Sequence, residues 1–176
     1  YEIGQAYYSK AERLAQQGEG APAQQAYNQA LEAYATQLEQ YPDPLFDMAA
    51  RFNSGLSRQM LGGDEESRQA LAIYRGIIEE DTDGTYGRSS QFQLARMQFG
   101  QQAYDESAKT YEEIITSAAD PTHLDIAHFE LGLVFGKAQK LELATEHLLQ
   151  VRERAPQFSL SRMEAARAYV GLAEFD

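Results

Sequence analysis

Histidines and a neighbouring aspartate are the residues in this chain best suited to metal binding or acid–base chemistry. His123 and His128 are five residues apart, and Asp125 lies three residues before His128, so Asp125 and His128 can share one helix face. Helical zinc sites of metalloproteases instead place two His four residues apart, with a Glu between them. We therefore interpret His123 as part of a helix-entry loop and His128 as an imidazole at the edge of the core. This interpretation expects no metal site.

Other side chains of catalytic type lack the partners that catalysis needs. The chain has no Cys, which excludes disulfides, thiolate zinc sites and a Cys nucleophile. The acidic run Glu79–Asp81 is typical of a solvated helix end, and Gly62-Gly63 is typical of a turn between helices and not of a phosphate-binding loop. No Gly-x-Ser-x-Gly sequence occurs. We expect neither an enzyme nor a bound cofactor, because no nucleophile and base are placed together.

Composition narrows the class of protein further. The 176 residues are 43% hydrophobic and carry a formal net charge of −12, which argues against nucleic-acid binding because phosphates would be repelled. No stretch approaches the ~20 consecutive apolar residues of a membrane-spanning helix. The chain begins at Tyr1 within a helical pattern, so we expect no targeting segment within these residues. Ala and Gln are abundant and β-branched residues are few, which favours an all-α fold.

A repeat of 37–40 residues determines the expected architecture. In each unit, a small residue is followed by a large apolar residue four positions later and by another seven or eight positions later. The sets are Ala30/Tyr34/Leu38, Ala70/Tyr74/Ile77/Ile78, Ser107/Tyr111/Ile114 and Ala144/Leu148/Val151. Apolar residues three and four apart within each half indicate one buried face per helix. The predicted helices cover 2–17, 22–41, 44–61, 64–80, 86–101, 104–118, 122–138, 141–154 and 159–174.

Helix starts can be read from Asp residues, although two of them allow alternatives. Asp43-Pro44 and Asp120-Pro121 each fit either an Asp cap with Pro in the first turn or a turn just before the helix. Asp64 is expected to cap the helix that follows, with the next two acidic residues in its first turn.

The fourth unit resembles the tetratricopeptide repeat (TPR) family. Its matching residues are Leu131, Gly132, Phe135, Ala144, Leu148 and Pro156, while His128 takes the place of the family's Trp. The resemblance implies a right-handed α-solenoid of antiparallel helix pairs, with about four repeats plus a C-terminal helix. It covers 1–176 as a single domain with units at about 1–42, 43–83, 84–120 and 121–156, followed by a partial unit or capping helix at 157–176.

Small residues at corresponding places explain how the two helices of a unit can approach each other. Gly55, Ala95 and Gly132 are expected where the helices cross, facing Ala70, Ser107 and Ala144 respectively. The long 37-residue unit and the Pro-containing turns resemble a bacterial envelope subgroup of the family, which includes the β-barrel assembly lipoprotein and the Tol–Pal-associated repeat protein. That resemblance implies a periplasmic or outer-membrane-associated protein, and a cytoplasmic location is the alternative.

The expected partner-binding site is the concave inner surface of the array, which the first helix of each unit lines. The set is rich in apolar and aromatic side chains and comprises Phe52, Asn53, Leu56, Phe92, Arg96, Phe99, Phe129, Leu133, Lys137 and Tyr169. Such a surface can anchor a protein or peptide, with Arg96 and Lys137 selecting an apolar segment that carries one or two acids. The alternative for each Phe is packing between helices. The alternative function is a structural array that self-associates as a homo-oligomer or docks onto other domains.

Overall fold

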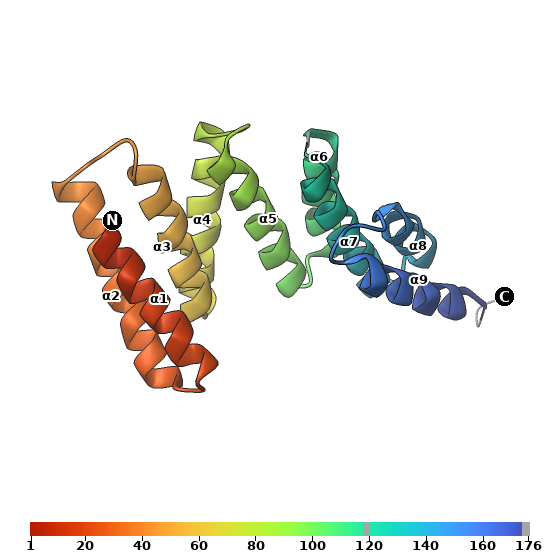
Figure 1. Cartoon of the computed structure of the whole chain (residues 1–176), viewed down its shortest axis with the longest axis horizontal. Helices are drawn as coiled ribbons and strands as arrows, with labels where there is room; N and C mark the ends of the chain where they lie inside the picture. Colours follow the sequence, from red (N-terminus) through yellow and green to blue (C-terminus); the bar gives the residue numbers. More distant parts are fainter. Residues whose placement is uncertain (118–119, 174–176) are drawn as a thin grey trace. The chain divides into compact units, whose positions relative to one another are not determined.

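Helices joined by short loops make up the computed structural model, which describes residues 1–117 and 120–173 (Figure 1). These residues contain no strand, so the predicted all-α class is confirmed for them. The helices are α1 (Glu2–Gln16), α2 (Gly20–Gln40), α3 (Asp47–Leu61), α4 (Asp64–Glu80), α5 (Thr85–Gly100), α6 (Tyr104–Ser117), α7 (Pro121–Lys137), α8 (Leu141–Gln150) and α9 (Phe158–Ala173).

Two compact units divide the chain, Tyr1–Ser90 and Gln91–Asp176, and their boundary falls within α5. The N-terminal unit contains α1–α4, and the C-terminal unit contains α6–α9. In each unit, helices that follow one another in the chain pack together, as in a helical array. The association of both units into a single domain and the individual repeat boundaries stay predictions.

In the N-terminal unit, tyrosines of the second helices pack on glycines of the first helices. The Tyr34 ring lies directly on Gly4, and Tyr74 Cε1 would lie 2.7 Å from a Cβ placed on Gly55. Both tyrosines are fully buried. A side chain at either glycine would therefore push the two helices apart. The expected crossing at Gly55 is confirmed.

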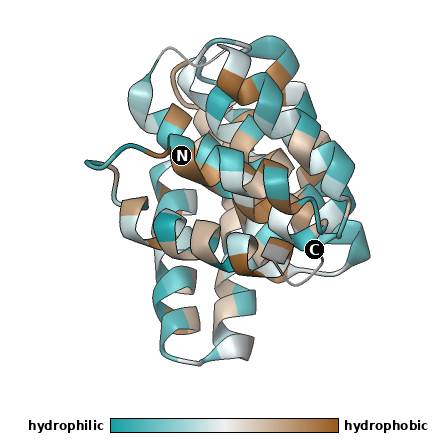
Figure 2. Cartoon of the chain, turned by 90° about the vertical axis from the view of Figure 1, so that its right-hand side faces the viewer, coloured by the Kyte–Doolittle hydropathy of each residue, from teal (hydrophilic) through white to brown (hydrophobic). Residues whose placement is uncertain are grey.

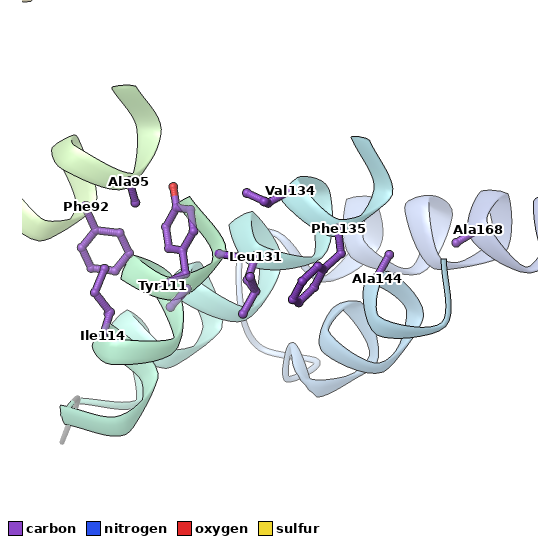
Figure 3. Packing of buried hydrophobic residues seen from close by; sticks show 11 residues of the cluster. Phe92, Ala95, Tyr111, Ile114, Leu131, Val134, Phe135, Ala144 and Ala168 are labelled. Carbon is purple, nitrogen blue, oxygen red and sulfur yellow. The ribbon is translucent and has the colours of Figure 1, made fainter. Parts of the chain in front are cut away.

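One larger cluster of apolar residues forms the core of the C-terminal unit (Figure 3). Here Leu148 Cγ would lie 2.5 Å from a Cβ on Gly132, and the carbonyl oxygen of Ala144 would lie 3.2 Å from it. Between α5 and α6, the buried Ser107 hydroxyl donates to the carbonyl oxygen of Ala95 at 2.9 Å. These contacts confirm that Gly132 and Ala95 face the small residues of the second helices.

The helices α1, α5 and α7, each the first of a helix pair, end with the same local geometry. The residue after the last turn has a positive φ at Gly18, Gln102 and Gln139, with values of 79°, 62° and 60°. In each case the next residue donates its N–H to a carbonyl oxygen five positions earlier. This is the hydrogen bond of a left-handed helix cap, which turns the chain sharply toward the second helix.

The Asp residues begin their helices in different ways. Asp120 caps α7, since its side chain accepts from the N–H of Thr122 at 3.2 Å and Pro121 occupies the first turn. Asp43 instead forms a turn before α3, where its side chain accepts from the N–H of Leu45 at 2.9 Å. The predicted cap at Asp64 is wrong, because α4 starts at that residue and its cap position is Gly63.

Figure 2 shows hydrophobic and hydrophilic residues mixed along the helices that face the viewer. Within the described part of the chain, no helix is long and apolar enough to cross a membrane.

Candidate functional site

The predicted binding residues of the N-terminal unit lie on α3 and are half-buried. The Phe52 ring packs between Tyr74 and Tyr86, with ring centroids 5.9 and 5.7 Å away. Asn53 donates from Nδ2 to the hydroxyl of Tyr1 at 3.2 Å. Leu56 is half-buried as well. Their side chains therefore hold α3 in place at least as much as they offer surface to a partner.

Phe92 lies in the core and not on an exposed groove. Its side chain is 6% exposed and packs beside Tyr111 and His123, with ring centroids 6.3 and 5.9 Å away. This placement corrects the expectation of an accessible anchor, because helix packing already covers the ring. Phe99 is half-buried against Tyr104 at 5.8 Å, and Phe129 is half-buried too.

Arg96 forms an ion pair with Glu130 of α7. Its Nη2 lies 2.6 Å from Glu130 Oε1, and its Nε also donates to that carboxylate. The hydroxyl of Tyr111 donates to the other oxygen of Glu130 at 2.6 Å. Burial and the negative charge of Glu130 raise the pKa of Tyr111 above its ordinary value, so the phenol stays protonated. Glu130 thus balances the charge of Arg96, whose side chain is 43% exposed, and the expected role of Arg96 as a selector of acidic partners stays a prediction.

Leu133 and Lys137 come together at an open pocket between α7, α8 and α9, which we call the α7–α9 pocket. Its volume is about 260 Å³. The pocket is lined by Gly132, Leu133, Gly136, Lys137, Gln139, Leu141, Ala144, Leu148, Glu164, Arg167 and Ala168. Glycine and alanine at four of these positions leave the space open. Tyr169, the last predicted residue, is 54% exposed on α9 and does not line the pocket.

Charged residues of the α7–α9 pocket give its rim a net positive charge. Lys137 is exposed, and Arg167 pairs through Nη1 with Glu164 Oε1 at 2.6 Å. Two cations and one carboxylate therefore surround an apolar floor, in a chain whose net charge is −12. A ligand with an apolar side chain and a nearby carboxylate complements this arrangement.

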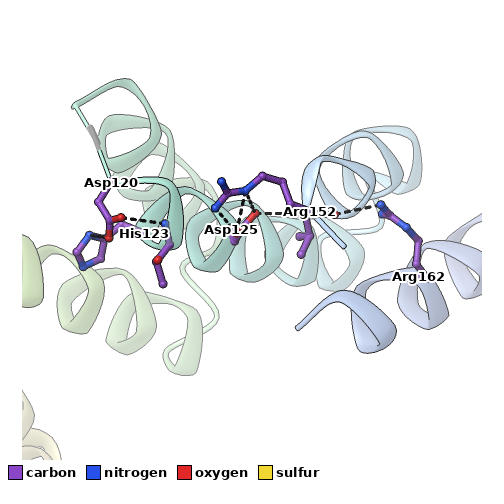
Figure 4. Close-up of polar contacts among 7 residues, drawn as sticks. Asp120, His123, Asp125, Arg152 and Arg162 are labelled. Atoms are coloured by element: carbon purple, nitrogen blue, oxygen red, sulfur yellow. Dashed lines mark hydrogen bonds and ion pairs between the residues drawn. The ribbon is translucent and has the colours of Figure 1, made fainter. Parts of the chain in front are cut away.

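His123, Asp125 and His128 take separate partners (Figure 4 shows the first two). His123 Nδ1 lies 2.9 Å from Asp120 Oδ2, across the first turn of α7. Asp125 is 4% exposed and binds Arg152, whose Nη2 lies 2.6 Å from its Oδ2. His123 and Asp125 thus pair with different residues, Asp120 and Arg152.

His128 contacts His147 of α8, a pairing that the sequence analysis did not predict. Its Nδ1 lies 3.0 Å from Nδ1 of His147, and the two rings are stacked with centroids 5.3 Å apart. Burial lowers the pKa of both imidazoles below the ordinary value, and the proximity of His147 lowers that of His128 further. The periodicity places both residues on inward-turned helix edges, but their juxtaposition depends on the register between α7 and α8.

Metal-binding clusters of the usual size are absent from residues 1–117 and 120–173. No group of three or more His, Cys, Asp or Glu side chains there is placed to hold one ion.

Comparisons with known proteins identify the class of fold. No protein-family model and no curated protein sequence matches the chain. Among solved structures, a kinesin light chain candidate of Podosopora anserina with nearly identical TPR-like repeats aligns at a TM-score of 0.71 and 19% identity. That alignment covers 97% of this chain and 87% of the other. The fold is therefore a TPR-like helical repeat array.

Two further structures support the same fold. MamA aligns at a TM-score of 0.62 and 17% identity, over 98% of this chain and 84% of the other. The apo form of RapI aligns at a TM-score of 0.68 and 13% identity, over 97% of this chain and 64% of the other. The predicted α-solenoid class is confirmed by these likenesses.

Proposed function

We propose that this chain is a non-catalytic interaction module that binds a protein segment carrying an apolar side chain close to a carboxylate. The observation that carries the proposal is the α7–α9 pocket, where an apolar floor meets Lys137 and Arg167. The TPR-like fold supports it, because helical repeat arrays use their extended surfaces for binding.

Pocket size favours a side-chain anchor over a small-molecule ligand. The volume of about 260 Å³ lies below the roughly 300–1,000 Å³ of typical small-molecule sites. An apolar side chain would bury itself against Leu133, Leu141 and Leu148, and the adjacent carboxylate would contact Lys137 or Arg167. The cations then determine specificity, while the apolar contact supplies most of the affinity.

Selection from a random peptide library displayed on phage tests this proposal without a known partner. Peptides enriched on the wild-type chain should share an apolar residue next to Asp or Glu. On the double variant Lys137→Glu/Arg167→Glu, the acidic preference should disappear or change to Lys and Arg. Lys109→Glu is the matched control, because Lys109 is exposed on α6 and does not line the pocket. An unchanged motif on the double variant would move the binding site elsewhere.

Self-association is the second candidate function, and exposed apolar residues of α9 favour it. Leu160, Met163, Tyr169 and Val170 are between 44% and 61% exposed. A helix that exposes such residues can pair with a second copy. Light scattering at several protein concentrations separates the two functions, because a peptide-binding module without its partner keeps the monomer mass.

For the cellular setting, we propose envelope assembly in a bacterium, in the periplasm or at the outer membrane. Support comes from the 37-residue units and their Pro-containing turns, which resemble the envelope subgroup. Fractionation of source cells, with detection of the native protein by antibody, tests this setting. Recovery in the cytoplasmic fraction would refute it.

A further inference from the structure

The Nδ1 atoms of His128 and His147 lie close enough together to bind the same metal ion. His128 lies in α7 and His147 in α8, and their Nδ1 atoms are 3.0 Å apart. The Phe135 ring packs on His147 with centroids 5.5 Å apart, which restrains that imidazole. Both histidines are half-buried, so part of each residue is exposed to solvent. None of these contacts is used by the proposed peptide site.

We propose that His128 and His147 bind one Cu(II) ion through their Nδ1 atoms. Metal–imidazole bonds are about 2.0–2.1 Å long. Two nitrogens 3.0 Å apart at such distances subtend an angle of about 91–97° at the metal. A right angle is the cis angle of tetragonal coordination, which Cu(II) and Ni(II) adopt with nitrogen and oxygen ligands.

The separation of the two nitrogens distinguishes between metals. Tetrahedral Zn(II) would require the nitrogens to be about 3.3–3.4 Å apart, so the helices would have to shift to accept it. Ca²⁺ and Mg²⁺ prefer oxygen ligands and do not suit an imidazole pair. Between the tetragonal ions, the general order of affinities places Cu(II) above Ni(II).

Nearby carboxylates favour a divalent cation without being required as ligands. Glu112 of α6 and Glu146 of α8 act electrostatically on His147, and Asp125 of α7 acts on His128. Asp125 is already held by Arg152. The two imidazoles therefore form the protein part of the site, and water completes the coordination sphere. Binding requires both rings to carry their proton on Nε2, so one ring of the hydrogen-bonded pair changes tautomer without net proton release.

Titration of the untagged, metal-free chain with CuCl2 tests the site, followed by calorimetry and electron paramagnetic resonance. We expect one saturable site per chain, with nitrogen hyperfine structure from two imidazoles. Because the second imidazole acts as an intramolecular ligand, either His128→Ala or His147→Ala should weaken binding about a hundredfold or more. The matched control is His123→Ala, whose imidazole pairs with Asp120 and should leave the affinity unchanged.

Folding of each variant is checked by circular dichroism before metal is added, and His147→Gln replaces any alanine variant that fails this check. Equal Cu(II) affinity in the wild-type chain and the double variant His128→Ala/His147→Ala would overturn the proposal. A resonance spectrum with a single imidazole nitrogen would overturn the two-ligand assignment. Tighter binding of Zn(II) than of Cu(II) would overturn the tetragonal geometry.

Discussion

Arg152 and Asp125 are joined by three kinds of hydrogen bond although they are 27 residues apart. Oδ1 of Asp125 accepts from the backbone N–H of Arg152 at 3.0 Å and from its Nε at 3.1 Å, while Oδ2 accepts from Nη2 at 2.6 Å. In a continuing helix, the N–H of Arg152 would instead donate to the carbonyl oxygen of Leu148. That oxygen accepts from Arg162 of α9 at 2.8 Å. These two arginines explain why α8 ends at Gln150.

Replacement of the buried carboxylate tests how much this contact stabilises the fold. Asp125→Ala should lower the free energy of unfolding by roughly 1–3 kcal/mol, because the N–H of Arg152 loses its acceptor. Asp125→Asn should cost less, since its amide oxygen can still accept that hydrogen bond. Urea unfolding measures both variants, and Lys109→Ala, at an exposed pair with an N–O distance of 3.9 Å, serves as the control. Equal losses for Ala and Asn would contradict a role for the backbone contact.

Acid should weaken the same contact in a defined pH range. The guanidinium and N–H of Arg152 lower the pKa of Asp125 below its ordinary value. A carboxyl with a lowered pKa in the folded state stabilises the protein above its unfolded pKa, near 3.9, and this stabilisation disappears as the pH falls through the folded pKa.

Between pH 5 and 3, the wild-type chain should therefore lose more stability than Asp125→Asn, which has no carboxyl to protonate. Urea unfolding at pH 7, 5, 4 and 3 gives the comparison. Parallel pH profiles for the two proteins would show that Asp125 titrates normally.

Two glycines of α7, one helical turn apart, should respond oppositely to the same substitution. A Cβ on Gly132 would lie 2.5 Å from Leu148 Cγ, whereas a Cβ on Gly136 would lie 4.0 Å from Ala144 Cβ. Gly132→Ala should therefore strain the helix crossing and destabilise the fold, and Gly132→Leu should cost about 1–3 kcal/mol. Gly136→Ala should stabilise the fold by about 0.5–1 kcal/mol, because alanine favours the helix. Thermal melts that move in the same direction for both alanine variants would refute this packing.

Most helices could be predicted from the sequence because apolar periodicity is a local property. The positions of Gly55 and Gly132 followed from the repeat, since the same helix crossing recurs in different units. Helix ends were harder. Asp43 and Asp120 precede Pro in the same way, yet only Asp120 caps a helix.

The candidate site could be predicted only in part, because contacts between helices depend on their register. Leu133 and Lys137 are one turn apart on α7, so a pattern on a single helix was enough to group them. The pairing of Arg96 with Glu130 and of His128 with His147 joins different helices. The sequence alone offers no signal for such distances.

Stability and peptide affinity should separate Phe92 from Leu133. Phe92 is buried beside Tyr111, so Phe92→Ala should lower the free energy of unfolding by about 3–5 kcal/mol. Leu133 is half-buried and lines the α7–α9 pocket, so Leu133→Ala should mainly weaken binding of a library-selected peptide, by about 2 kcal/mol or more if it is a central anchor. Urea unfolding and fluorescence anisotropy with a labelled peptide measure the two quantities, under conditions where each variant is folded. Weak binding by folded Phe92→Ala, with unchanged affinity in Leu133→Ala, would instead place the peptide on the surface between α5 and α6.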